Sequence, residues 1–301
     1  MAFSVSLQTP GRVDECPDRG AALKCLFGTY SAGEPGARAY SDIPAMVLKY
    51  IIESVTGEPL FDCVRRMILL PAGMTETYSR IPPERKNNCM LYEPEYRIEK
   101  DRYLKRGHPR GVPHDPKAAL LSPDGSDLCG HAGMFSTRRD MVRFCQAVLN
   151  GDILSDDSLR EMAVNRTGRL LPDGSYTQHL GYMCSVRNPI QYFSELPPFM
   201  SDRAFAIPGF TGNHICIDPE KKLFILQLGN RVRDRLTVCL PEDGKTIEDY
   251  GLNHDGSGQI VWPDGTRVTS SVKYVHQRDD HLYPEALSVI KDENFGTGVA
   301  G

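Results

Sequence analysis

The sequence predicts an α+β protein in which helices come first along the chain and antiparallel strands follow. Two strongly periodic helical patterns begin at Asp42 and Thr137. Runs typical of strands follow at 180–186, 203–219 and 221–232. Because helices and strands are segregated rather than alternating, we expect an antiparallel sheet flanked by helices, with a helical subdomain beside it.

The helices are predicted from apolar spacing and from their end signals. From Asp42 the apolar residues recur every three or four positions, and Gly57 supplies a stop. A second helix follows in LFDCVRRMILLPAGM and ends near Pro71. Thr137, with Asp140 three residues later, resembles a capping box, and Ser155 is a candidate N-cap for a short helix in LSDDSLREMAV.

The remaining segments divide the chain. Residues 1–39 are expected to be irregular, with one short helix around AALKCLFGTY, and residues 74–130 are rich in Pro, Gly and charge. GQIVWPDGTRVTS indicates a hairpin that turns at 263–265, and YPEALSVI a closing helix. We therefore expect an irregular segment at 1–39 and an incomplete domain at 40–301, which is mainly helical over 40–165 and sheet-forming over 166–301.

Composition narrows the partners. The chain has 301 residues, 40% of them hydrophobic and 25% charged, as in ordinary globular proteins, and its net charge of -4 gives no attraction to nucleic acid or anionic lipid. No run of about 18 apolar residues and no signal peptide is apparent. The nine cysteines form no C-x-x-C pair, which favours reduced thiols and a cytoplasmic location. We expect a small-molecule or peptide partner, no nucleic acid and no membrane.

Common catalytic signatures are missing. The chain has no G-x-S-x-G, no P-loop and no G-x-G-x-x-G. His108 and His114, like His276 and His281, are spaced so that they would not share a helix face. We therefore predict no metal site and no cofactor.

Three segments, in order, carry a family resemblance: AYSDIPAMVLKYIIESVTGEPLFDCVRRMILLPAGM, GHAGMFSTRRDMVRFCQAVLNG and FAIPGFTGNHICIDPEKKLFILQLGNRV. They resemble the serine β-lactamase and penicillin-binding-protein family, in the branch with class C β-lactamases, D-alanyl-D-alanine carboxypeptidases and esterases. The resemblance implies a β-lactamase/transpeptidase-like fold. It also implies acyl transfer on a β-lactam, a D-Ala peptide or an ester.

The resemblance implies a base at the mouth of the first long helix. In this family a Tyr-x-Asn, or Tyr-Ser-Asp in many esterase-like members, opens that helix, so Tyr40 would help to deprotonate a nucleophilic serine. Ser41 would be a binding position, and Asp42 stands where the lactamases have Asn. That difference favours an esterase or amidase over a lactamase.

The third family motif is altered. The family's Lys-Thr-Gly or His-Thr-Gly corresponds to Ile207, Pro208 and Gly209. Ile207 carries no positive charge and Pro208 has no N–H. By resemblance, the Phe210 N–H would form half of an oxyanion hole, and Ile207, Gly209 and Thr211 would line the substrate site.

The nucleophile is not evident. The family places Ser-x-x-Lys well upstream of the tyrosine, and residues 1–39 contain no such pattern, so the N-terminal part of the fold is expected to be missing. The Ser-x-x-Lys pattern occurs twice late in the sequence, at Ser270 in SSVK and at Ser288 in SVIK. Two matches to so short a pattern are expected by chance. Ser270 would be the nucleophile only if the order of the family's segments were circularly permuted in this chain. In the family the serine lies on an apolar, buried helix, whereas Ser270 is followed by the polar run YVHQRDDH, which argues against this role.

Three functional interpretations remain open. The chain is a hydrolase of this family, impaired or inactive as this chain, or a catalytically silent homologue that binds a ligand or a protein. Alternatively, it is a truncated fragment whose exposed sheet edge and apolar faces lead to self-association. His114 and His131 are expected to bond backbone carbonyls, and His214 is a candidate replacement for the lost cation.

Overall fold

The computed structural model describes residues 6–32, 41–91, 95–99, 102–106, 110–170, 172, 179–191, 194–230, 248–250, 253–254, 260–261 and 283–292. The chain divides into two compact units. The first comprises residues 1–89, 111–208 and 214–226, and the second residues 90–110, 209–213 and 227–301.

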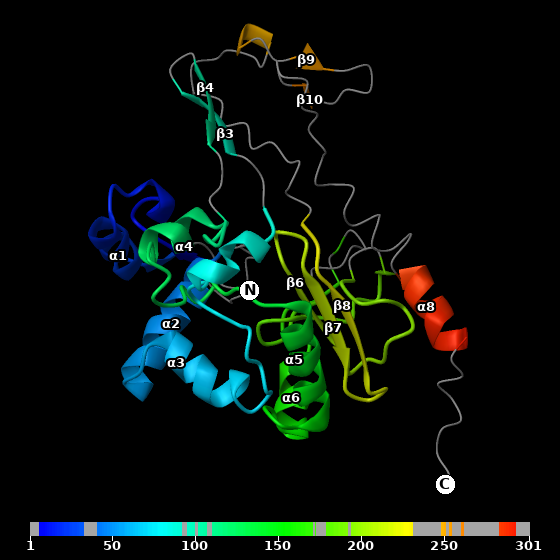
Figure 1. The fold of residues 1–301 in the computed structure, drawn as a ribbon. Helices are drawn as coiled ribbons and strands as arrows, with labels where there is room; N and C mark the ends of the chain where they lie inside the picture. Colours follow the sequence, from blue (N-terminus) through cyan, green and yellow to red (C-terminus); the bar gives the residue numbers. More distant parts are fainter. Residues whose placement is uncertain are drawn as a thin grey trace. The chain divides into compact units, whose positions relative to one another are not determined.

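The first unit combines helices with a four-stranded sheet (Figure 1). The helical elements are η1 (Val13–Glu15), α1 (Arg19–Phe27), α2 (Ile43–Thr56), α3 (Leu60–Val64), η2 (Arg65–Leu69), η3 (Pro83–Asn88), α4 (Pro116–Leu121), α5 (Arg138–Asn150) and α6 (Asp156–Met162). The strands are β1 (Ser6–Gln8), β2 (Tyr30–Ala32), β5 (Ser185–Val186), β6 (Phe205–Pro208), β7 (His214–Asp218) and β8 (Leu223–Gln227), the last residue of which belongs to the second unit. The predicted α+β class is confirmed.

The first long helix, α2, ends as predicted. Gly57 adopts the left-handed conformation with φ +71°, and its N–H donates to the Glu53 carbonyl (2.9 Å). Glycine adopts this conformation without the steric cost of a Cβ.

The predicted second helix is confirmed but is not uniform. It consists of α3 and the π-helical turn η2, in which the Leu70 N–H donates to the carbonyl of Arg65 five residues earlier (2.9 Å). The π-helical turn ends at Leu69 with Leu70 as its C-cap, and Pro71 has no N–H to donate. Turn hydrogen bonds continue beyond Pro71, since the Ala72 N–H donates to the Ile68 carbonyl (3.0 Å) and the Met74 N–H to the Leu69 carbonyl (2.8 Å).

The capping box predicted for α5 is half right. The Asp140 N–H donates to Thr137 Oγ1 (3.3 Å), so Thr137 is the N-cap. The Asp140 carboxylate does not return to Thr137: its Oδ2 accepts from the Glu76 N–H (2.6 Å) and from Thr77 Oγ1 (2.8 Å). A fully buried carboxylate needs such donors, and the loop before residue 78 provides them. The N-cap predicted for α6 is confirmed, since Ser155 Oγ accepts from Ser158 N–H (3.2 Å).

The sheet has the order β5-β6-β7-β8. Its antiparallel register pairs Phe205 with Ile217 and Pro208 with His214. Phe205 and Ile217 pack into a core with buried residues of α5 and α6, among them Val148 and Leu159. The predicted turn after β7 is fastened by the buried Asp218, which accepts from the N–H and hydroxyl of Ser201 and from two amides of the turn.

Several expectations were wrong or fall outside the described ranges. Residues 1–39 were predicted to be irregular apart from one helix; that helix is α1, but β1 and β2 pair there, and three-residue strands leave little periodic signal. In the second unit, β3 (Glu95–Glu99) and β4 (Arg102–Arg106) pair antiparallel within the Pro-, Gly- and charge-rich segment 74–130, for which no strand was predicted. The same unit contains η5 (Glu248–Tyr250), the pair β9 (Asn253–His254) and β10 (Ile260–Val261), and α8 (Tyr283–Asp292), the predicted closing helix. The predicted turn at 263–265 lies outside the described residues.

Two general properties accompany this fold. The eight cysteines within the described ranges carry free thiols. None of the helices in those ranges has both the length and the apolar character required to cross a bilayer.

A buried ammonium group ties the first unit together. Lys49 Nζ lies 2.5 Å from Glu53 Oε1 and 2.8 Å from Asp127 Oδ2, and only 9% of its side chain is exposed. Both carboxylates also accept from the start of α3, where the Leu60 N–H donates to Glu53 (2.8 Å) and the Phe61 N–H to Asp127 (3.0 Å). Burial opposes the charge on Lys49, but its hydrogen bonds to Asp127 and Glu53 outweigh burial and raise its pKa.

Replacing this ammonium should destabilise the fold. We expect Lys49→Met to lower the free energy of unfolding by about 2–3 kcal/mol, because two half-buried carboxylates would lose their shared cation. Urea denaturation measures the change. Arg66→Met is the control: Arg66 pairs with Glu58 at an exposed position (3.2 Å), so its loss should cost less than about 1 kcal/mol. Equal effects of the two substitutions would contradict the role given to Lys49.

Candidate functional site

The residues that open α2 are held by local and distant contacts. Ser41 Oγ accepts from the Ile43 N–H (3.2 Å), as an N-terminal cap would. The carbonyl of Asp42 begins the helix by accepting from Ala45 and Met46, while its carboxylate makes no capping bond. Instead, Asp42 Oδ2 lies 3.1 Å from Lys117 Nζ, so this carboxylate serves a long-range ion pair.

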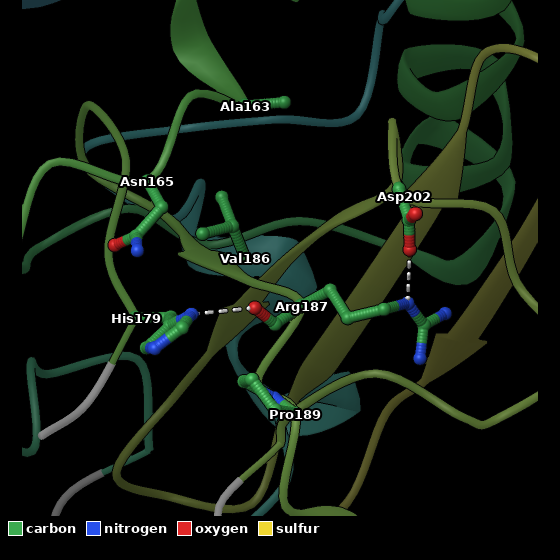
Figure 2. Close-up of a pocket in the computed structure, with 7 residues that line it drawn as sticks. All are labelled: Ala163, Asn165, His179, Val186, Arg187, Pro189 and Asp202. Atoms are coloured by element: carbon green, nitrogen blue, oxygen red, sulfur yellow. Dashed lines mark hydrogen bonds and ion pairs between the residues drawn. The ribbon is translucent and has the colours of Figure 1, made fainter. Parts of the chain in front are cut away.

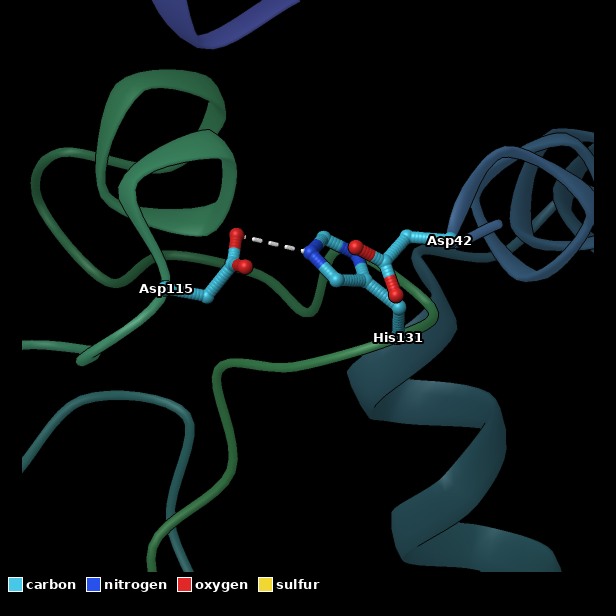
Figure 3. A group of neighbouring side chains, drawn as sticks. All are labelled: Asp42, Asp115 and His131. Carbon is cyan, nitrogen blue, oxygen red and sulfur yellow. Dashed lines mark hydrogen bonds and ion pairs between the residues drawn. The ribbon is translucent and has the colours of Figure 1, made fainter. Parts of the chain in front are cut away.

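Lys117 joins Asp42 to a second acidic group. Its Nζ lies 3.3 Å from Asp115 Oδ2, and Asp115 Oδ1 lies 2.8 Å from His131 Nε2. Asp115 is also the N-cap of α4, because its Oδ1 accepts from the Ala118 N–H (2.9 Å). Figure 3 shows Asp115 and Asp42 beside the His131 ring, one beyond each side of it. We call Asp42, Lys117, Asp115 and His131 the α2-mouth network.

The α2-mouth network stabilises its own charges. Burial alone would raise the pKa of Asp115, but the hydrogen bond and charge of His131, the Ala118 amide and Lys117 together hold that pKa well below its usual range. Burial likewise disfavours the Lys117 ammonium, but Asp115 and Asp42 outweigh it and raise the pKa of Lys117. The Asp115 carboxylate and the Lys117 ammonium are therefore both charged around neutral pH.

The network also contains metal-ligand types. Ligand atoms of Asp42, Asp115 and His131 lie within 4.8 Å of one another, the only such group of three in the described part of the chain. The ammonium of Lys117 contacts both carboxylates, however, and supplies the positive charge that they would otherwise take from a metal ion. The donor set therefore fits an ion-pair network better than a cation site.

A glycine brings the His131 loop against α2. Gly130 has φ +84°, and a Cβ at this position would lie 2.3 Å from the Ala45 carbonyl oxygen. Only glycine permits such an approach. His131 follows directly, and its Nδ1 lies 3.3 Å from the Cys129 carbonyl. The predicted contact of His131 with a backbone carbonyl is confirmed, and the sequence did not reveal its ion pair with Asp115.

The altered third motif lies at the end of β6. Ile207 is paired with Ile215 across the sheet and is 36% exposed. Gly209, Phe210 and Thr211 belong to the second unit, where the Gly209 N–H donates to the Asn213 carbonyl (2.6 Å) in the turn that leads to β7. Phe210 is half exposed.

His214 is not an exposed replacement for the lost cation. Its side chain is fully buried, and Nε2 lies 3.0 Å from the Glu195 carbonyl and 3.1 Å from Cys216 Sγ. The suggestion that it faces a ligand is therefore wrong. Position on a strand could not reveal this, because the segment that covers β7 is distant in sequence.

A pocket of about 350 Å³ lies elsewhere in the first unit (Figure 2). No motif residue lines it, and Arg187, one of its polar groups, already pairs with Asp202 (Nε to Oδ1, 3.1 Å). The other lining residues are Ala163, Asn165, His179, Val186 and Pro189. This pocket is not part of the site built on the motifs.

Not every predicted site residue is placed. Tyr40 and Ser270 lie outside the described residues. Conversely, sequence reasoning missed Lys117 and Asp115. Their signal was the run HDPK, in which an aspartate directly precedes a proline, a pattern typical of a helix N-terminus.

The Asp115 carboxylate of the α2-mouth network should make the free energy of unfolding depend on pH. Because the pKa of Asp115 is lower in the folded protein than in the unfolded chain, its charge stabilises the fold above about pH 4, and this contribution is lost as the pH falls through the folded-state pKa. We expect Asp115→Asn to be less stable than wild type at pH 7 and to lose less stability between pH 7 and pH 3. Urea denaturation across this range measures it, with the exposed Asp152→Asn as control; parallel curves for wild type and Asp115→Asn would contradict the assignment.

Curated proteins resemble this chain over most of its length. The chain is 28% identical to a putative D-alanyl-D-alanine carboxypeptidase of Escherichia coli K12 over 221 residues, which cover 71% of this chain and 50% of that protein. The homologue of Salmonella paratyphi B is 29% identical over 221 residues, with the same coverage. The chain thus spans about half the length of the curated relatives it matches.

Solved structures share the fold at low identity. EstCE1, described as a hydrolase with promiscuous acyltransferase activity, has a TM-score of 0.51 and 18% identity, over 71% of this chain and 56% of EstCE1. Simvastatin synthase (LovD) from Aspergillus terreus has a TM-score of 0.50 and 14% identity, over 75% of this chain and 58% of LovD. The family model named Beta-lactamase matches residues 18–239, more than half of the chain. The chain therefore belongs to the Beta-lactamase family of serine hydrolases and transpeptidase-like proteins.

Proposed function

We propose that this chain contributes to acyl transfer on a β-lactam, a D-alanyl peptide or an ester. The observation that carries the proposal is the family match over 18–239, which includes Tyr40-Ser41-Asp42 at the mouth of α2. The carboxypeptidase names of the relatives support a D-alanyl peptide as one substrate class.

In this proposal Tyr40 is the base. The ionised form of the tyrosine, the phenolate, accepts the proton of the serine hydroxyl. A nearby cation lowers the pKa of the tyrosine and so increases the fraction that is ionised. The Lys117 ammonium, 3.1 Å from the carboxylate of Asp42 two residues after Tyr40, is the cation that we propose for this role. The helical region 40–165 would then carry the base. The sheet region 166–301 would carry the Phe210 amide as half of the oxyanion hole.

The lack of an evident serine nucleophile limits the activity that we propose. Ser270 is the only candidate that we retain within the chain, and its sequence context is unlike that of the family's serine. We therefore propose that the chain by itself is impaired or inactive in acyl transfer. The free thiols of the described cysteines support a reducing, cytoplasmic location.

The second candidate is a homologue that binds a ligand without turning it over, since no serine in the family's context is evident in the chain. In the family, a cation where this chain has Ile207 contacts a substrate carboxylate, whereas isoleucine can offer only apolar contact. Of the binding positions that the family resemblance implies, Ser41 belongs to the first unit and Gly209 and Thr211 to the second.

Covalent labelling tests the two candidates. We expect no stoichiometric adduct when the folded chain is exposed to a fluorophosphonate or, separately, to a penicillin, as measured by intact-mass spectrometry. The reason is that Tyr40 has no serine of the usual family context to deprotonate.

Two variants give the labelling experiment its controls. Ser270→Ala and Tyr40→Phe are treated in parallel, and a circular-dichroism melt shows that each is folded. An adduct on wild type that Ser270→Ala abolishes and Tyr40→Phe slows would establish an active permuted site and contradict the proposed inactivity. Weak reversible binding of penicillin without an adduct would favour the silent homologue.

Restoring the missing cation should strengthen ligand binding. We expect Ile207→Lys to tighten the Kd for a penicillin by about 10-fold, since a charge-assisted hydrogen bond to the carboxylate is worth roughly 1.5 kcal/mol. Ile207 is partly exposed, so the longer side chain can be accommodated. Isothermal titration measures the Kd. Met134→Lys, at an exposed position outside the motif, controls for net charge. An equal gain in both variants would argue against a carboxylate site at 207.

A further inference from the structure

Two cysteines lie together beside the first helix of the chain. Cys25 is on α1, and its Sγ donates to the Gly11 carbonyl (3.3 Å). Cys16 directly follows η1, and its Sγ donates to the Arg12 carbonyl (3.5 Å), which is the next carbonyl along the same segment. Both thiols are therefore held against the short segment that joins β1 to η1. We call Cys16 and Cys25 the α1 dithiol.

The backbone around the α1 dithiol keeps the two thiols together. Gly28 directly follows α1, and a Cβ at this position would lie 2.9 Å from Pro10 Cγ, so the end of the helix lies against the segment that contains Gly11. The antiparallel pairing of β1 with β2 closes this part of the chain into one loop. Cys16 and Cys25 are close enough to hydrogen-bond to each other. Two thiols in contact are the starting geometry for a disulfide, whose S–S bond is about 2.05 Å long.

The α1 dithiol is accessible to a small oxidant. Cys16 and Cys25 are both partly exposed, whereas Cys145 and Cys184 are buried. Burial raises the pKa of Cys145 to about 12 and that of Cys184 to about 11, so these two remain unreactive thiols. Partial burial and the neighbouring Cys25 also raise the pKa of Cys16. The thiolate is the reactive form, so we expect the dithiol to react slowly at neutral pH.

We propose that the α1 dithiol is a redox-sensitive modification site at which a peroxide closes a disulfide between Cys16 and Cys25. One thiolate attacks an oxygen of hydrogen peroxide, the O–O bond breaks, and the cysteine becomes a sulfenic acid while the departing hydroxide takes up a proton as water. The second thiolate attacks the sulfenic sulfur, the S–S bond forms, the S–O bond breaks, and a second water leaves. The two sulfurs are oxidised by two electrons and the peroxide is reduced to two waters.

The disulfide would fasten α1 to η1 on a core that α2 shares. Val13 of η1, Leu26 of α1 and Met46 of α2 belong to one buried cluster, and both cysteines pack against it. A disulfide that closes the loop 16–25 restricts the unfolded chain, so oxidation should raise the Tm by about 5 °C. This modification site does not depend on the proposed acyl transfer.

Oxidation of the whole chain by hydrogen peroxide tests the proposal. We expect intact-mass spectrometry to show the loss of two hydrogen atoms, and dithiothreitol to restore them. Trypsin cleaves after Arg19 and Lys24, between the two cysteines, so mapping without reductant should recover their two peptides joined. Cys16→Ser and Cys25→Ser should each fail to form this bond. In each variant dimedone, a reagent for sulfenic acids, should label the cysteine that remains.

Two controls separate this disulfide from general oxidation. Cys89→Ser removes another partly exposed thiol and should still form the bond between Cys16 and Cys25. Cys16→Ala with Cys25→Ala should melt like the reduced wild type and show no rise in Tm after peroxide. The proposal is overturned if Cys16 and Cys25 stay reduced in excess peroxide, if either pairs mainly with another cysteine, or if the double variant shows the same rise in Tm. The mapping of wild type needs no substitution, so it decides the question even where a variant does not fold.

Discussion

The Lys49 ammonium is the interaction on which the helical part of the first unit depends. It lies between the carboxylates of Glu53 and Asp127, and each of these also accepts an amide from the first turn of α3. One buried cation thus joins α2, α3 and the loop that follows α4. Because both carboxylates are needed for the amides, the cation balances charges that the helix junction requires.

The α2-mouth network performs the same task at the other end of the helix. Lys117 links Asp42 to Asp115, and Asp115 links α4 to the His131 loop. Gly130 allows that loop to lie against the backbone of α2. The segment 115–131 therefore contacts the first half of α2, at Asp42, Ala45 and Lys49.

The segments that carry the second and third family motifs, at the start of α2 and the end of β6, differ in their charged groups. At the mouth of α2, charged groups are present and mutually stabilised. At the end of β6, Ile207 stands where the family resemblance implies a cation. The histidine nearest in sequence, His214, is buried in the sheet beside Glu195 and Cys216. At β6 the packing of the sheet is intact, and the proposed substrate site would lack a charge from Ile207.

The sequence by itself determined the α+β class, the family, and the helices and strands with strong local signals. Gly57, Thr137 and Ser155 mark helix ends because caps act over a few residues, and the strands around 205–227 alternate with clear turns. Only the tertiary structure decided where charged side chains point: Asp42 pairs with Lys117, and Asp140 accepts from the loop at Glu76 and Thr77. These partners lie more than sixty residues apart in the chain. No local period encodes such a pairing; it follows from which surfaces come together when the apolar faces are buried.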